Sequence, residues 1–173
     1  MSRYHTIIEN DISNGSKFHV SFWVQGCPHR CKGCFNPETW DFTTGALYTP
    51  DTKKQIIKAI NANGIQRNLS ILGGEPLAEQ NLPMIVDLLK TVKEIYPTIE
   101  IFLWTGYYIE QLNKSHPDIE SVLSNVDYLI DGPFIEEKKD LSLLLRGSTN
   151  QRIWYHKEPN LWEKFKENSF SLK

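Results

Sequence analysis

Hydrophobic residues along the chain gather in short runs that alternate with longer amphipathic stretches. Four runs rich in β-branched and aromatic residues predict strands, at 17–26, 69–74, 98–106 and 126–132. Apolar residues at helical spacing predict a helix over 52–64, with Asp51 as its cap. A second helix is expected over 78–97, and a third over 107–114 that extends towards 119–125.

The order of these elements predicts an α/β fold. Strand, loop and helix recur along the chain, which is typical of a parallel α/β sheet or barrel with helices outside. Such folds carry their chemistry in the loops that follow the strands. The motifs CPHRCKGC, GGEP, WTGY and DGPF each follow a predicted strand, so we expect them to meet at one site. One further strand is expected before residue 156, and 157–173 is interpreted as a charged, aromatic tail on a single domain 1–173 with a core of about 17–156.

Composition narrows the possible partners. The 173 residues carry a net charge of −2, which offers no electrostatic footprint for nucleic acid. There is no lysine-rich block for an anionic membrane, no run near the ~18 apolar residues of a membrane span, and no secretory signal. We therefore expect a cytoplasmic protein, and in a reducing compartment clustered cysteines more often bind metal or do redox work than form bridges.

All three cysteines lie within eight positions: Cys27, Cys31 and Cys34. Pro28 and Gly33 favour a loop over a helix there. Three interpretations compete: a redox pair of Cys31 and Cys34, a zinc site with His29 as a fourth ligand, or a 4Fe–4S cluster held at three irons with the fourth open to a non-protein ligand. The spacing favours the cluster, since fully protein-ligated clusters use four cysteines and a vacancy suggests chemistry at the open iron.

Other loop residues have both a functional and a plain structural interpretation. Gly73 and Gly74 would let the backbone approach a ligand closely, or would simply form a strand-to-helix turn. Asp131 and Thr105, at strand ends, could bind an ammonium or a hydroxyl, or could belong to ordinary turns. Trp104 is expected to be a packing residue, as is Tyr107.

Taken together, the motifs carry a resemblance to a known family. VQGCPHRCKGCFNPETWDF, LGGEPL, WTGY, VDYLIDGPFIEE and LRGSTNQRI occur in this order in a short chain. They resemble the radical S-adenosylmethionine superfamily and, more narrowly, the activating proteins of anaerobic ribonucleoside-triphosphate reductase, from about Phe18 to Ile153. The resemblance implies a partial (β/α) TIM-like barrel of the radical S-adenosylmethionine type, with one 4Fe–4S cluster on Cys27, Cys31 and Cys34.

The same resemblance implies a chemistry. S-adenosylmethionine would chelate the open iron, and one electron from a flavodoxin-like donor would cleave it to methionine and a deoxyadenosyl radical. That radical would abstract hydrogen from a backbone glycine of the reductase, which makes the chain a radical oxidoreductase, a glycyl-radical activase. Residues implied to bind the cofactor or cosubstrate are Gly33, Phe35, Gly73, Gly74, Glu75, Thr105 and Asp131. Residues that would contact the cosubstrate or the reductase are Arg146, Asn150 and Arg152.

One position departs from the superfamily pattern. Many members have an aromatic residue immediately before the third cysteine, whereas here Gly33 precedes it and Phe35 follows it. Adenine packing is therefore expected from the backbone of 33–35, and His29 is expected to be a neighbour of the cluster or an exposed residue. Two alternatives stay open: activation of another glycyl-radical enzyme such as pyruvate formate-lyase, and a non-catalytic zinc-binding interaction module.

Overall fold

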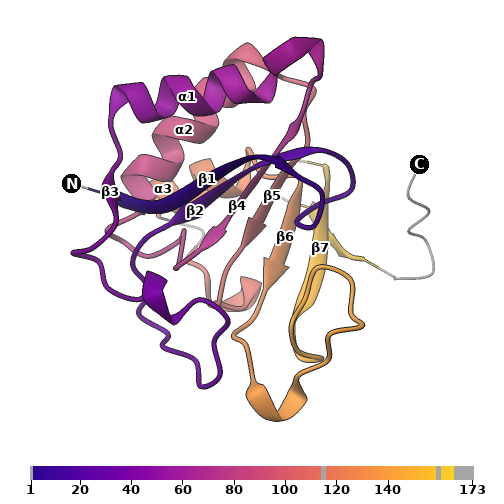
Figure 1. Cartoon of the computed structure of the whole chain (residues 1–173). Coiled ribbons are helices and arrows are strands. Elements are labelled where there is room, and N and C mark those ends of the chain that lie inside the picture. Colours follow the sequence, from indigo (N-terminus) through magenta and orange to yellow (C-terminus); the bar gives the residue numbers. More distant parts are fainter. Residues whose placement is uncertain (1, 114–115, 159–160, 166–173) are drawn as a thin grey trace.

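The computed structural model describes residues 2–113, 116–158 and 161–165. Eight strands in these ranges form one sheet in the order β3-β1-β2-β4-β5-β6-β7-β8 (Figure 1). The strands are β1 (Arg3–Asp11), β2 (His19–Val24), β3 (Ala46–Leu47), β4 (Asn68–Gly73), β5 (Ile101–Trp104), β6 (Tyr128–Asp131), β7 (Arg152–Glu158) and β8 (Leu161–Lys164). The α-helices are α1 (Pro50–Ile60), α2 (Leu82–Ile95) and α3 (Pro117–Leu123), and the short 3₁₀ turns are η1 (Pro37–Thr39), η2 (Ala62–Gly64), η3 (Ile109–Gln111) and η4 (Glu136–Lys138).

The expected partial (β/α) TIM-like barrel is wrong, because the chain forms a mixed, strand-rich sheet. Among the described strands, only the neighbours β2–β4, β4–β5 and β5–β6 pair in parallel. β1 pairs antiparallel with β2 and also with β3, and β7 pairs antiparallel with β6 and β8. The sequence pattern missed β1 because about half of its residues are exposed and the rest carry no clean alternation. Past β6 the chain returns along the sheet without a crossover helix, so the strand–helix repeat stops there.

The sequence pattern predicted the first two helices well and the third poorly. α1 is capped by Thr49, whose hydroxyl accepts from the amide of Thr52 at 3.2 Å, while the expected cap Asp51 lies inside the first turn. In α2 the expected apolar face is buried or half-buried. The helix expected over 107–114 is wrong: η3 is a single 3₁₀ turn, and α3 begins afresh at Pro117, whose fixed φ suits a first helical position. Lys114 lies outside the described residues.

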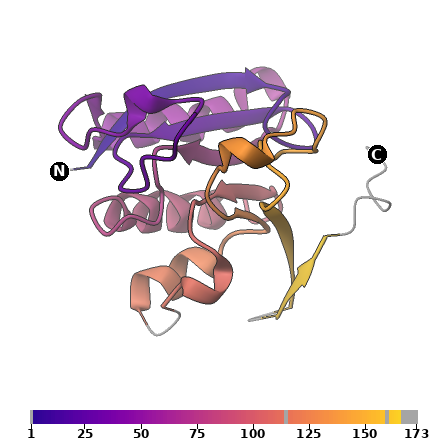
Figure 2. The ribbon, with the colours of Figure 1, turned by 90° about the horizontal axis from the view of Figure 1, so that it is seen from below.

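The two faces of the sheet are covered differently. The three helices lie on one face, where alternate strand residues such as Val20, Phe22 and Ile71 join the main core (Figure 1). On the other face Phe102, Ile130 and Ile153 form a smaller cluster with Trp104 and other half-buried side chains. Loops rather than helices approach this second face, and Figure 2 shows segment 27–45 and segment 133–147 at the same end of the sheet.

The expected tail is partly built into the sheet. Residues Leu161–Lys164 pair with β7 as the edge strand β8, and residues 166–173 lie outside the described part of the chain. Within the described ranges, no helix combines the length and the apolar composition that crossing a bilayer requires.

Candidate functional site

The cysteine segment is a loop that leaves β2 at its carboxyl end. Its start is fastened to η1, because the amide of Gly26 donates to the carbonyl of Thr39 at 2.7 Å and that of Cys27 donates to Trp40 at 3.1 Å. Gly33 adopts a positive φ of 71°, so the chain turns sharply just before the third cysteine. All three cysteines are half-buried, and all three line one cavity.

Beside this loop lies a cavity of about 460 Å³, on the face of the sheet away from the helices. It is walled by the loop after β2, the ends of β4 and β5, and segment 133–147. The residues expected from the sequence that line it are Cys27, Cys31, Cys34, Phe35, Gly73, Gly74, Glu75, Thr105 and Arg146. The expected residues outside its lining are Gly33, Asp131, Asn150 and Arg152. The structure therefore brings together segments that are distant in the sequence.

Glu75 joins these segments. Its side chain is fully buried, and Oε2 lies 2.8 Å from His29 Nε2 and accepts from the Gly106 amide at 2.7 Å. Oε1 accepts from the Thr105 hydroxyl at 2.8 Å and from the Leu77 amide at 2.9 Å. Since a carboxylate only accepts, the imidazole of His29 donates. Both oxygens are thus occupied by groups of the protein itself.

Gly73 and Gly74 allow the end of β4 to approach the end of β2. A Cβ on Gly74 would lie 2.4 Å from the carbonyl oxygen of Gly26, and one on Gly73 would lie 2.8 Å from backbone atoms of Val24. Gly73 also has a positive φ of 108°. Any side chain here would push the cysteine loop away from the strand, so the pair sets the position of the loop. Contact of these glycines with a cosubstrate stays a prediction.

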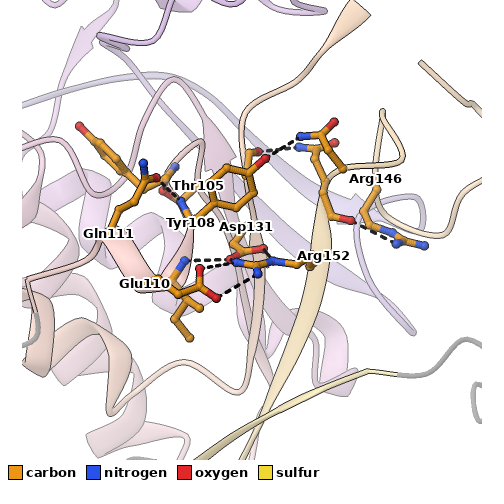
Figure 3. Close-up of polar contacts among 12 residues, drawn as sticks. Thr105, Tyr108, Glu110, Gln111, Asp131, Arg146 and Arg152 are labelled. Carbon is orange, nitrogen blue, oxygen red and sulfur yellow. Dashed lines mark hydrogen bonds and ion pairs between the residues drawn. The ribbon is translucent and has the colours of Figure 1, made fainter. Parts of the chain in front are cut away.

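Asp131 and Arg152 form a separate network next to the cavity (Figure 3). The buried carboxylate of Asp131 accepts from Arg152 Nε at 2.9 Å and Nη2 at 2.5 Å, and from the Ile109 amide at 2.8 Å. Arg152 also binds both oxygens of Glu110, at 3.0 and 2.7 Å. These hydrogen bonds raise the pKa of the Arg152 guanidinium, which stays charged and fastens η3 to the ends of β6 and β7. A cosubstrate contact at Asp131 or Arg152 stays a prediction.

Arg146 and Asn150 lie on the segment that leads into β7. Arg146 lines the cavity, and its Nη1 donates to the carbonyl of Gln151 at 3.3 Å. Burial lowers the pKa of its guanidinium, although Asp140 acts in the opposite direction. The Asn150 amide donates to the carbonyl of Pro133 at 2.8 Å, which holds the start of segment 133–147. Their contact with a cosubstrate or a reductase stays a prediction.

Burial dominates the acidity of the thiols. It raises the pKa of Cys27 to about 11, with a smaller contribution from the charge of Glu75, against the backbone amides of His29 and Arg30. Burial also raises the pKa of Cys31. These two thiols are protonated at neutral pH without metal, so metal binding releases protons.

The donor set fits an iron–sulfur cluster. Three soft thiolates on one short loop face a single cavity, and thiolates are the ligands that such clusters use. Each thiolate of a cluster binds its own iron, so the sulfurs do not need to meet at one point. Among the described residues, no three His, Cys, Asp or Glu side chains are grouped to hold a single metal ion. Apolar neighbours such as Phe134 and Leu143 also line the cavity and limit its contact with water.

Sequence reasoning missed several wall residues. Trp23 and Leu72 line the cavity because they alternate with core residues on β2 and β4, so strand periodicity could have placed them. Leu143 and Leu145 come from an irregular segment that has no periodic signal. His29, expected to be a neighbour or exposed, is mostly buried and packs edge-on against Tyr107 at 4.4 Å.

The comparisons with known proteins agree with this site. The sequence profile of the family described as "4Fe-4S single cluster domain" matches residues 13–154, most of the chain. The chain is thus an iron–sulfur protein, with a cysteine loop and a cavity that suit that class.

Curated relatives identify the family within the class of iron–sulfur proteins. The relatives from Vibrio cholerae and Escherichia coli K12 are 38% and 37% identical over 151 residues, which cover 87% of this chain and 96% of each relative. A relative from enterobacteria phage T4 is 38% identical over 151 residues, 87% of this chain and 92% of its own. All three bear the name anaerobic ribonucleoside-triphosphate reductase-activating protein. The chain belongs to this family of activating proteins.

Proposed function

We propose that this chain is a radical S-adenosylmethionine activase that generates a glycyl radical on an anaerobic ribonucleoside-triphosphate reductase. The observation that carries the proposal is the convergence of Cys27, Cys31 and Cys34 with the GGEP and WTGY loops on one cavity. The printed names of the relatives support the reductase as the protein acted upon. The cluster-domain match supports the cofactor.

The chemistry comes from the bound groups. A reduced 4Fe–4S cluster on Cys27, Cys31 and Cys34 would supply one electron to cleave the sulfonium C–S bond of S-adenosylmethionine. The products would be methionine and a 5′-deoxyadenosyl radical, which would become 5′-deoxyadenosine by taking a hydrogen atom from a glycine Cα. The protein contributes position and exclusion of water. The three cysteines would hold three irons and leave one open to the methionine amino and carboxylate groups.

The roles of the other residues follow from the contacts described above. The carboxylate of Glu75 is occupied by His29, Thr105 and Gly106, so it fixes the loops around the cavity rather than the ligand. Recognition of the methionine end is assigned to backbone groups of Gly73 and Gly74, which line the cavity. Phe35 lines the same cavity beside Cys34 and is assigned to adenine packing together with the backbone of 33–35.

A reduced flavodoxin-like protein in the cytoplasm is the proposed electron donor. The net charge of −2 supports a partner other than nucleic acid. Arg146, Asn150 and Arg152 remain candidates for contact with the cosubstrate or the reductase, and Asp131 for contact with the cosubstrate, since they lie in or beside the cavity wall.

The test is an anaerobic incubation of reconstituted protein with reductant, S-adenosylmethionine and the reductase from the same organism. Electron paramagnetic resonance should show a glycyl-radical doublet on the reductase, and 5′-deoxyadenosine should accumulate. The Cys31→Ala variant should lose iron and both signals, because a cluster with two thiolates is poorly held. A parallel arm with pyruvate formate-lyase tests the choice of substrate. A wild-type protein that contains the cluster but forms no 5′-deoxyadenosine would refute the proposal.

A further inference from the structure

Two large apolar side chains stand exposed at the mouth of the cavity. Phe35 and Leu141 both line it, yet they are 52% and 71% exposed. They come from two segments of the wall, the cysteine loop and segment 133–147, which touch where Phe35 packs on Phe134. Because the deeper wall residues Phe134 and Leu143 are more buried, the exposed pair marks the side on which the cavity opens.

The segment that carries Leu141 is held firmly. Two hydrogen bonds close the stretch around Leu141, from the Asp140 amide to the carbonyl of Gly147 at 3.0 Å and from the Thr149 amide to that of Lys138 at 2.9 Å. The indole of Trp104 donates to the carbonyl of Leu145 at 2.9 Å, which ties the segment to β5. Leu141 is therefore presented on a fastened loop, which lies near the cysteine segment in Figures 1 and 2.

The residues around Phe35 and Leu141 are of the kinds found in protein-binding interfaces. Phe35 packs against Phe134 at a centroid distance of 5.0 Å, and the ammonium of Lys139 lies 5.2 Å from the centre of its ring. Lys32 pairs with Glu136 at 3.0 Å, which joins the same two segments. An apolar centre surrounded by charged side chains is typical of surfaces that bind another protein.

We infer that Phe35 and Leu141 form a docking lip for the glycine-bearing segment of the reductase, so the inference rests on the proposed function. Hydrogen abstraction requires the glycine Cα to reach the cosubstrate inside the cavity. A volume of about 460 Å³ is the size of a small-molecule site. The protein substrate must therefore cross the mouth as a thin segment. Glycine has no side chain, so it enters the cavity past the mouth while the residues on either side of it pack on Phe35 and Leu141.

The experiment compares wild-type, Leu141→Ser and Ile65→Ser proteins, all with the cluster in place. Ile65 is also exposed, at 50%, but it precedes β4 at the opposite end of the parallel strands and is the matched control. The quantity measured is the reductase concentration that gives half-maximal glycyl-radical formation. Leu141→Ser should raise it about fivefold or more, the effect of removing an important interface residue, whereas Ile65→Ser should leave it unchanged. Leu141→Met, which keeps an apolar surface, should restore most of the loss.

Cleavage of S-adenosylmethionine without reductase is measured in parallel, so that the two proposals fail differently. No cleavage by the wild type refutes the proposed function itself. Cleavage by the wild type with equal half-maximal concentrations for all variants overturns the docking lip. A fall in reductase-free cleavage by the same factor as in radical formation also overturns it, because Leu141 would then act inside the cavity.

Amide hydrogen exchange on the wild type gives a second, independent answer. Residues 139–147 should become protected when the reductase is added, and an unchanged exchange rate there overturns the inference. Sedimentation without reductase tests a second copy of this chain as the occupant. A dimer that Leu141→Ser dissociates would overturn the assignment to the reductase.

Discussion

His29 Nε2 lies 2.8 Å from Glu75 Oε2, which joins the cysteine loop directly to the loop after β4. The same oxygen accepts from the Gly106 amide, so one carboxylate connects the loops that follow three neighbouring parallel strands. Because Glu75 is fully buried, these contacts are not exchanged for water, and they fix the relative positions of the cavity walls.

Replacing Glu75 by Gln should reduce the free energy of unfolding by about 2 kcal/mol, the cost of leaving buried donors badly paired. The amide NH₂ of Gln would face donors that now meet a carboxylate oxygen. Urea unfolding followed by circular dichroism measures the change. Glu79→Gln is the control, since Glu79 is exposed and its replacement should shift stability by less than about 0.5 kcal/mol. Equal stability of the two variants would show that the Glu75 contacts contribute nothing.

Gly74→Ala should disturb the cysteine loop through steric overlap alone. The added Cβ would lie 2.4 Å from the backbone oxygen of Gly26, which cannot rotate away. We expect a loss of about 3 kcal/mol, at the upper end for overpacking, together with a lower iron content after reconstitution. Gly64→Ala is the control for backbone strain without steric overlap, because Gly64 has a φ of 70° and open space around it. This substitution should reduce the free energy of unfolding by only about 1 kcal/mol. If Gly74→Ala retained full stability and iron, close packing would not position the loop.

Arg152→Ala should destabilise the protein by about 3 kcal/mol, because it leaves the buried carboxylate of Asp131 without its cation. Lys157 is a control on the same strand, since it pairs with Glu163 where both side chains are 40–49% exposed. Lys157→Ala should cost less than about 1 kcal/mol. Thermal unfolding of the two variants side by side measures the difference, and similar melting temperatures would contradict the assigned role of the Asp131 pair.

His19 should make stability depend on pH. It is fully buried, and burial lowers its pKa to about 4, although the charge of Asp11 opposes the shift. In the unfolded chain His19 binds a proton near pH 6.5, whereas in the folded protein it does so only near pH 4. The contribution of neutral His19 to the free energy of unfolding is therefore fully present above pH 6.5 and is lost as the pH falls towards 4. The shift corresponds to about 3 kcal/mol over the whole window.

Urea titrations at several values between pH 4 and pH 7 test this dependence on wild type and His19→Gln. The variant should show a flatter profile in the window because it lacks the titrating ring. His5→Gln, at an exposed position on β1, serves as the comparison for a lost imidazole at the surface. A profile for His19→Gln as steep as that of the wild type would assign the dependence to other groups.

The sequence pattern predicted the central strands well and the strands beside them poorly. β2, β4, β5 and β6 are short apolar runs that end in loops, so composition and punctuation placed them. β1 was missed because half of its residues face solvent, and its pairing with β2 is a long-range relation that no local pattern encodes. That antiparallel strand, with β7 at the other side, is what makes the sheet mixed. The expected barrel was wrong because β1 and β7 both pair antiparallel with the central strands.

The site was predictable where residue type alone limits the chemistry. The cysteines and the two glycines of GGEP could be placed at one cavity because each group follows a predicted strand, and the loops after parallel strands meet at one edge of the sheet. The partners of Glu75 could not, since His29, Thr105 and Gly106 approach it only after three loops fold together. The partner of Asp131 could not be predicted either, because Arg152, which donates to both of its oxygens, lies 21 residues further along the chain.

The cavity wall comes from segments that are distant in the sequence, so its parts are synthesised at different times. A growing chain leaves the ribosome from its amino end, so Cys27, Cys31 and Cys34 emerge well before Gly74 and Leu141. During that interval the thiols are exposed to oxidants and stray metals without the walls that later surround them. We therefore expect the cluster to be held stably only after the polypeptide is complete and the walls of the cavity have formed.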